Sequence, residues 1–284
     1  MIEGDETMEV RYTADPQALK RMTSEEIRKM FLVDQLFNSG SVDMVYSDVD
    51  RSIVGSAIPL NKKLKLKSSK KEMAADYFLE RREIGIINIG KDGFIKADDN
   101  EYPMANKDAL YIGRGTKSVE FGSRKSKDPA AFYFASFPAH KDFPTTHAAF
   151  NTVEHTPMGN AKDANKRTIN KYIHPNGIKS CQLVMGLTEL EEGSVWNTMP
   201  VHTHQRRSEI YMYFNLSDDV VLFHLMGEPG ETRHIVIRNR QVVISPSWSI
   251  HSGVATQNYS FIWAMGGENQ AFDDMDWVAM KSIQ

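Results

Sequence analysis

The sequence predicts an all-β protein made of two copies of one β unit, with a short helix near its N-terminus. From Met44 onward, short runs of Val, Ile, Tyr and Phe alternate with Gly, Asp, Asn and Pro, which is typical of strands and turns. One segment near the start has a helix-capping pattern, and the two halves resemble each other weakly. A chain of 284 residues is long enough for one large or two ordinary domains.

The expected helix lies within residues 16–37. Thr23 and Glu26 have the spacing of a capping box, and they precede a periodic apolar face formed by Ile27, Met30, Phe31 and Val33. We expect a short helix that packs against a β domain.

Two stretches of β pattern follow. The first contains IGIINIG, ALYIGRG and AAFYFASF, and residues 91–93 (KDG) indicate a hairpin turn between Ile89 and Phe94. The second contains CQLVMGLTEL, EIYMYFNL, VVLFHLMG, RHIVIRN, QVVISP and SFIWAMG. No Gly-rich loop opens a helix, which disfavours nucleotide binding of the Rossmann or P-loop kind.

Residues 138–166 separate the two stretches. This segment is polar and rich in turn residues, with too few apolar residues for a core strand, so we expect an inter-domain linker there. The expected domains are residues 1–145 and 146–284.

The internal similarity aligns two pairs of segments. ERRE (80–83) aligns with QRRSE (205–209) if one residue is skipped at Ser208, and the following IGIINI then aligns with IYMYFNL. The same frame places DALYIG (108–113) opposite QVVISP (241–246). The common order of the two matches favours a duplicated unit.

Composition excludes several classes of partner. The 34 Lys and Arg nearly balance 37 Asp and Glu, a net charge of -3, which disfavours nucleic acid or an anionic membrane as a partner. No apolar run approaches the roughly 20 residues of a membrane span, and the acidic start MIEGDETMEV is unlike a secretory signal, so we expect a cytoplasmic protein. The single cysteine, Cys181, rules out an internal disulfide.

The strongest chemical signal is His202-Thr203-His204, followed by Glu209 and His251. Histidines at i and i+2 of a strand point to the same face. Glu209 is five residues past His204, so the intervening residues must turn or bulge before it can join them. A histidine pair alone is common in strands without any metal, but the added carboxylate and third imidazole favour a site for Zn, Mn, Fe or Ni. Zinc is our first choice, and Ca or Mg is a poor fit.

The pattern HxHxxxxE followed by PxxxxH resembles the two metal motifs of the cupin superfamily. The surrounding segments NKRTINKYI (165–173), NTMPVHTHQRRSE (197–209), ISPSWSIHSG (244–253) and GGENQAFDDMD (266–276) resemble the 5-keto-4-deoxyuronate isomerase family, also called 4-deoxy-L-threo-5-hexosulose-uronate ketol-isomerase. YFLERREIGIINIG and DALYIG extend the resemblance over nearly the whole chain.

The resemblance implies two cupin-type β-barrels in tandem, a homo-hexamer, one zinc ion per subunit, and a cytoplasmic step in the breakdown of pectin-derived uronates. It implies conversion of 5-dehydro-4-deoxy-D-glucuronate to 3-deoxy-D-glycero-2,5-hexodiulosonate. The metal ligands would be His202, His204, Glu209 and His251, and Glu209 could double as the catalytic base.

A keto-uronate substrate needs a cation for its carboxylate, and the candidates are Arg167, Lys171, Arg206 and Arg207. Any of them could instead be a solvated surface charge. We favour Arg167 and Lys171, because side chains of a strand entering the second barrel can point inward. Arg206 and Arg207 are expected to extend into solvent from their turn.

In the first barrel, the alignment places Tyr77, Leu79 and Glu83 at the positions of His202, His204 and Glu209. Without the imidazole pair, a first-row ion could not be held tightly. We therefore expect the N-terminal barrel to be metal-free and structural.

Two other functions fit the same four ligands, because a barrel fold alone does not determine function. One is an oxygenase or oxalate-type decarboxylase, which would require oxygen. The other is a non-catalytic sugar-binding or storage barrel, in which the ion holds the fold without turnover.

Overall fold

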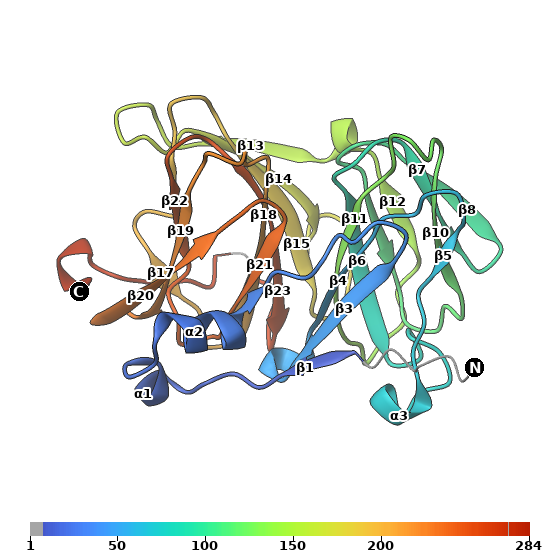
Figure 1. Cartoon of the computed structure of the whole chain (residues 1–284), viewed down its shortest axis with the longest axis horizontal. Coiled ribbons are helices and arrows are strands. Elements are labelled where there is room, and N and C mark those ends of the chain that lie inside the picture. The colour runs from blue at the N-terminus through green and yellow to red at the C-terminus, as the bar shows by residue number, and fades with distance from the viewer. Residues whose placement is uncertain (1–7, 272) are drawn as a thin grey trace. The chain divides into compact units, whose positions relative to one another are not determined.

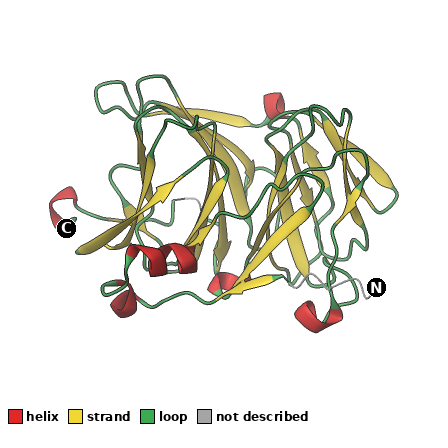
Figure 2. Ribbon diagram, in the orientation of Figure 1, coloured by secondary structure: helices red, strands yellow, loops and turns green. Residues whose placement is uncertain are grey.

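The computed structural model describes residues 8–271 and 273–284, and β-strands make up most of its regular structure (Figure 2). The chain divides into two compact units (Figure 1). The first comprises Met1–Arg11 and Leu36–Asn151, and the second comprises Tyr12–Gln35 and Thr152–Gln284. The predicted all-β class with two tandem β units is confirmed.

The first unit has a seven-stranded and a four-stranded sheet. The larger sheet has the order β1 (Glu9–Arg11), β3 (Val42–Ser47), β4 (Ile53–Ala57), β11 (Phe132–Pro138), β6 (Arg82–Asn88), β9 (Ala109–Ile112), β12 (Thr146–Ala148). The smaller has the order β5 (Leu64–Lys65), β10 (Val119–Ser123), β7 (Gly93–Ala97), β8 (Asn100–Met104). Its short helices are η1 (Val49–Arg51) and α3 (Lys70–Met73), and both sheets contribute to one apolar core.

The second unit repeats this plan. Its larger sheet has the order β13 (Glu154–Met158), β14 (Arg167–Ile173), β15 (Val184–Leu190), β23 (Ser260–Gly267), β18 (Arg207–Phe214), β21 (Gln241–Ser245), β2 (Leu32–Val33). The smaller has the order β16 (Trp196–Asn197), β22 (Ser252–Ala255), β19 (Leu222–Glu228), β20 (Glu231–Ile237). A separate pair joins β17 (His202–Thr203) to β24 (Asp276–Trp277). The remaining short helices are η2 (Phe150–Thr152) and η3 (Met280–Ser282).

The strand order confirms the predicted duplication. The central order β4-β11-β6-β9 of the first unit recurs as β15-β23-β18-β21 in the second, and the smaller sheets also correspond strand by strand. Strands β6 and β18, which carry the similar sequence segments, therefore occupy equivalent places.

Equivalent residues in β6 and β18 can be counted from their first residues, Arg82 and Arg207. Ile84 and Glu209 are then both third in their strands. Ile84 belongs to the core of the first unit, and Glu209 lies on the same strand face as Tyr211, which belongs to the core of the second. Ile84 is therefore the counterpart of Glu209.

The predicted equivalence of Glu83 with Glu209 is wrong by one residue. Glu83 lies on the opposite face of β6, where its Oε2 accepts a hydrogen bond of 2.7 Å from the Tyr111 hydroxyl. No residue has to be skipped at Ser208. A slip of one position moves a side chain to the other face of a sheet, which is why the skip misplaced the carboxylate.

The predicted hairpin at residues 91–93 is also wrong, because β6 and β7 belong to different sheets. Strand β7 instead pairs with β8. Gly93 is required by close packing, since a Cβ atom there would lie 2.6 Å from Ala130 Cβ and 2.6 Å from Gly122 O.

The N-terminal helical segment packs on the second unit, which differs from the predicted division at 145/146. It contains α1 (Pro16–Leu19), α2 (Ser24–Phe31) and β2, and Figure 1 shows α2 beside β20 and β21. The capping box is confirmed: Thr23 N donates to Glu26 Oε2 at 2.7 Å, and Glu26 N donates to Thr23 Oγ1 at 3.3 Å. The apolar face of α2 completes the core of the second unit.

The predicted linker contains β12 and β13, which are edge strands of the two large sheets, and the units divide between residues 151 and 152. Edge strands need fewer apolar residues than core strands, which explains the polar composition of this segment. Within the described part of the chain, no helix combines the length and apolar character that spanning a membrane requires.

Candidate metal centre

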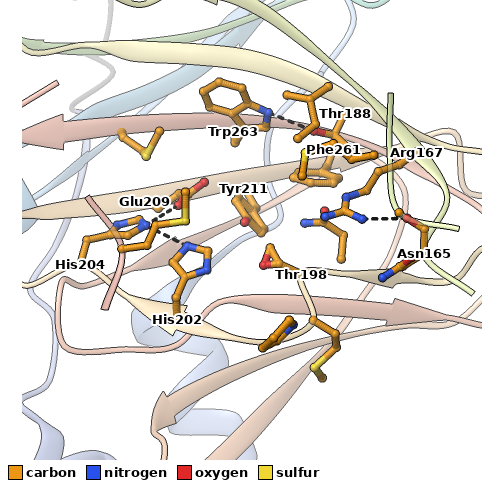
Figure 3. Close-up of a pocket in the computed structure, with 18 of the residues that line it drawn as sticks. Asn165, Arg167, Thr188, Thr198, His202, His204, Glu209, Tyr211, Phe261 and Trp263 are labelled. Atoms are coloured by element: carbon orange, nitrogen blue, oxygen red, sulfur yellow. Dashed lines mark hydrogen bonds and ion pairs between the residues drawn. The ribbon is translucent and has the colours of Figure 1, made fainter. Parts of the chain in front are cut away.

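The second unit brings together the four side chains that the sequence singled out. His202 lies on β17, His204 follows it, Glu209 lies on β18, and His251 directly precedes β22. One ligand atom from each lies within 4.8 Å of the others, and all four residues are buried. Figure 3 shows His202, His204 and Glu209 directed toward one another.

The ligand atoms are closely spaced. His202 Nε2 lies 3.1 Å from His204 Nε2 and 3.0 Å from His251 Nε2. Glu209 Oε2 lies 2.9 Å from His251 Nε2 and 3.2 Å from His204 Nε2. Metal–ligand bonds of about 2.0–2.2 Å place neighbouring ligand atoms about 2.8–3.6 Å apart, so these spacings fit one ion.

The predicted turn before Glu209 is present. Residues 205 and 206 form it, and Arg207 N donates to His204 O at 3.3 Å. The turn carries the chain from β17 into the larger sheet, where Glu209 can face the histidines.

The protonation states also suit a cation. Burial lowers the pKa of His202 to about 2 and that of His204 to about 3. Burial raises the pKa of Glu209, but the charge and hydrogen bond of His251, with further effects of His204 and His202, outweigh it and give a pKa of about 2. Two neutral imidazoles and an ionised carboxylate therefore face one point at neutral pH, and these are the forms that bind metal ions.

Nδ1 of His251 lies 3.4 Å from the Ser249 carbonyl oxygen, which can only accept a hydrogen bond. Nε2 is therefore the ring nitrogen directed toward the other ligand atoms, and a bound cation would take the place of any proton there. A cation would relieve the repulsion among the converging lone pairs, so the residues fit a divalent metal.

Three members of the group, His202, His204 and Glu209, line one end of a cavity of about 310 Å³. Arg167 and Asn165 also line it, and in Figure 3 Thr198 and Tyr211 lie between them and the histidines. Most of the remaining wall is apolar and includes Ile169, Met199, Phe261, Trp263, Met265 and Met275.

Arg167 lines the cavity and has no carboxylate partner among the described residues. Its side chain is buried, its Nη1 donates to Asn165 O at 2.7 Å, and its buried Nε has no hydrogen-bond partner. No ion pair joins it to any acidic residue in the part of the chain that the structure describes. Burial lowers its pKa. A buried, uncompensated cation is costly, so this guanidinium suits an anionic ligand.

Arg206 and Arg207 hold the C-terminal segment. Arg206 forms ion pairs with Asp274 and, at 3.0 Å, with Asp276. Arg207 lines the cavity and donates through Nη1 to Ala271 O. The expectation that Arg207 extends into solvent is wrong, because strand alternation places it on the same face as Glu209.

Two of the four predicted substrate cations are thus in the cavity, namely Arg167 and Arg207, whereas Lys171 and Arg206 are not among its lining residues. Lys171 forms a 2.7 Å ion pair with Glu154, its directly opposite residue on β13. This cross-strand pair, four residues along β14 from Arg167, holds its amino group away from the cavity.

Many of the cavity residues were not predicted from the sequence, among them Tyr211, Thr198 and Trp277. Tyr211 could have been found, because it follows Glu209 by two positions on the same strand face. Thr198 carries a buried hydroxyl, but nothing in its sequence context distinguishes it. Trp277 lies with its ring centroid 5.3 Å from that of His202, and only the β17–β24 pairing reveals this contact.

Among the described residues, only His202, His204, Glu209 and His251 form such a group of potential ligands. The metal-free state of the first barrel stays a prediction.

Comparisons with known proteins agree over nearly the whole chain. The model of the KduI/IolB family matches residues 31–280. A 4-deoxy-L-threo-5-hexosulose-uronate ketol-isomerase of Caldicellulosiruptor bescii is 55% identical over 277 residues, covering 98% of this chain and 100% of the relative. Enzymes of the same name from Halalkalibacterium halodurans and Escherichia coli are 50% and 49% identical, each with 98% of this chain and 100% of the relative covered.

Solved structures show the same fold at low sequence identity. An IolB-like protein from Salmonella typhimurium has a TM-score of 0.66 at 13% identity, with 87% of this chain and 96% of that chain covered. A mutant of Bacillus subtilis oxalate decarboxylase has a TM-score of 0.59 at 11% identity, with 85% and 78% covered. The predicted family resemblance is confirmed, and the chain belongs to the KduI/IolB family.

Proposed function

We propose that this chain is a metal-dependent ketol-isomerase that converts 5-dehydro-4-deoxy-D-glucuronate to 3-deoxy-D-glycero-2,5-hexodiulosonate. The predicted enzyme class agrees with the names of the full-length relatives. One observation of the structure carries the proposal: His202, His204 and Glu209 of a buried His₃–Glu group line the same cavity as Arg167, a buried arginine without a carboxylate partner among the described residues. Such a cavity suits a short substrate with a carbonyl at one end and a carboxylate at the other.

The reaction moves a carbonyl from C1 to C2. A proton leaves C2, negative charge develops on the oxygens, and a proton returns to C1. His202, His204, Glu209 and His251 would hold a divalent ion, which when bound supplies Lewis-acid stabilisation of that charge.

Glu209 is our proposed base. It is ionised at neutral pH, the form that accepts a proton, and it lies among the residues that face C1 and C2 in this arrangement. It would take the proton from C2 and return it to C1 on the same side of the substrate.

Arg167 would bind the substrate carboxylate through its Nε edge, because Nη1 is already occupied by Asn165 O. This contact fixes which end of the substrate reaches the histidines. The apolar wall around Phe261 and Trp263 limits water near the reacting carbons. Arg207 would add positive charge to the same cavity while holding the C-terminal segment.

The family resemblance also supports zinc as the ion, ahead of manganese, iron or nickel. It supports a homo-hexamer and a cytoplasmic place in the breakdown of pectin-derived uronates. The fold likeness to oxalate decarboxylase, at 11% identity, supports the fold alone.

The test is anaerobic incubation of the metal-loaded protein with the keto-uronate, followed by NMR of the sugar. We expect turnover without oxygen in the wild type, and loss of both metal and turnover in His204→Ala. Turnover that requires oxygen would favour an oxygenase or decarboxylase. Metal retention without turnover would favour a sugar-binding barrel. Full metal occupancy in His204→Ala, measured by elemental analysis, would refute the ligand assignment.

A further inference from the structure

A threonine hydroxyl in the cavity has no protein partner. Thr198 directly follows β16, lines the cavity, and carries a buried Oγ1 without a hydrogen bond to any described residue. Thr188 lines the same cavity, but its Oγ1 accepts a hydrogen bond of 3.1 Å from Trp263 Nε1. A buried hydroxyl without a partner costs free energy, and a ligand oxygen can supply the missing hydrogen bond.

The position of this hydroxyl corresponds to the middle of the substrate. In Figure 3, Thr198 lies between His202 and Arg167. If the proposed function is correct, C1 and C2 lie at the histidines and the carboxylate lies at Arg167. The carbons between them carry a hydroxyl at C3, no oxygen at C4, and a carbonyl at C5. Of these, C3 and C5 present oxygens that a hydroxyl can bind.

Three other polar side chains of the cavity have partners in the protein. Asn165 Oδ1 accepts from Asn160 N at 3.0 Å, Thr188 Oγ1 accepts from Trp263 Nε1, and the Tyr211 hydroxyl hydrogen-bonds Glu209. Much of the wall is apolar, with Ile169 and Phe261 among its members, and it cannot hydrogen-bond a substrate oxygen.

We infer that Thr198 is a specificity-determining residue whose hydroxyl hydrogen-bonds an oxygen of the middle carbons of the substrate. This inference rests on the proposed function, because the direction of the substrate follows from the metal and carboxylate ends. The hydroxyl can donate to the C5 carbonyl, and it can donate to or accept from the C3 hydroxyl.

The test compares Thr198→Val, which keeps the shape and removes the hydroxyl, with Thr198→Ser, which keeps the hydroxyl. Thr168→Val is the matched control, since Thr168 lies on β14 beside Arg167 but outside the lining of the cavity. We expect Thr198→Val to lose about 3-fold to 10-fold in kcat/KM, the effect of one neutral hydrogen bond. Thr198→Ser and Thr168→Val should stay within about twofold of the wild type.

Stability and metal content separate this role from a structural one. Because the hydroxyl has no partner in the protein, Thr198→Val should keep its metal and should melt at the same or a higher temperature than the wild type. A lower melting temperature or lost metal in Thr198→Val would overturn the inference. An analogue lacking the C3 hydroxyl identifies the oxygen: the variant's defect disappears with this analogue if C3 is the partner and persists if it is C5.

The two hypotheses fail in different ways. If the metal-loaded wild type does not turn over the keto-uronate, the proposed function is wrong, and the inference falls with it. If the wild type is active and Thr198→Val has the same kcat/KM, only the role of Thr198 is refuted.

Discussion

Replacing Arg167 with Met tests how the cavity recognises a carboxylate. Methionine keeps much of the side-chain bulk and removes the guanidinium, whose buried Nε edge is available for a ligand. A hydrogen bond to a charged group contributes about 1.5–3 kcal/mol, so losing one should lower kcat/KM about tenfold to 150-fold.

The structure also predicts what this change does to stability. Arg167 Nη1 donates one hydrogen bond of 2.7 Å to Asn165 O, and the variant loses it. The variant also removes a buried cation that has no acidic partner among the described residues, which offsets part of that loss. We therefore expect the free energy of unfolding to change by no more than about 1 kcal/mol.

The assay measures kcat/KM for the keto-uronate, metal content, and urea unfolding. Lys171→Met is the matched control: it lies on the same strand, and its amino group pairs with Glu154 outside the cavity lining. We expect it to keep near-full activity. Near-full activity of Arg167→Met, or an equal loss in both variants, would falsify the assignment of the carboxylate to Arg167.

Three other predictions follow from the fold. Glu83→Gln should keep metal content and kcat/KM within about twofold of the wild type, because Glu83 lies on the face of β6 that points away from the core. Loss of the metal in this variant would contradict the revised register. Thr23→Ala should lower the free energy of unfolding by about 0.5–2 kcal/mol through loss of the capping box, and an unchanged urea midpoint would count against it. Folding lowers the pKa of His202 and His204 from 6.5 to about 2 and 3, so the unfolded chain binds more protons. In urea unfolding of the metal-free protein, the free energy of unfolding should therefore fall as the pH drops below about 6.5. The expected slope is about 1.4 kcal/mol per pH unit for each histidine. An equal free energy of unfolding at pH 7 and pH 5 would contradict this prediction.

The grouping of the four candidate metal ligands could be predicted from the sequence, because the spacing of the residues determines which side chains share a face. A histidine pair at i and i+2 shares a face of any strand, and the offset of Glu209 requires a turn whatever the rest of the fold. The strand order of the duplicated units was harder to predict from the sequence, although the similarity of ERRE and QRRSE indicated the repeat.

The register of β6 could not be read from its sequence. All seven of its residues are buried, so no alternation of polar and apolar side chains fixes which ones face the core. The same difficulty applied to Arg207, which carries a charge but is buried within a fully buried strand.

Contacts between distant parts of the sequence explain why Lys171 and Arg206 do not line the cavity as predicted. Lys171 forms a cross-strand ion pair with Glu154, and Arg206 forms ion pairs with carboxylates about 70 residues further along the chain. The pattern of residues in a single sequence does not reveal the ion-pair partner of either side chain.

The packing of residues 12–35 on the second unit has a consequence for synthesis of the chain. Leu32 pairs with Val243, so this segment must wait during synthesis for a strand that is made roughly 200 residues later. At ribosomal rates of about 5–20 residues per second, this delay is about 10–40 s. During that time Ile27 and Phe31, which end in the core, lack their final partners. Residues 152–284 produced alone would also lack this part of their core, so the unit that carries the His₃–Glu group needs residues 12–35 to complete its own fold.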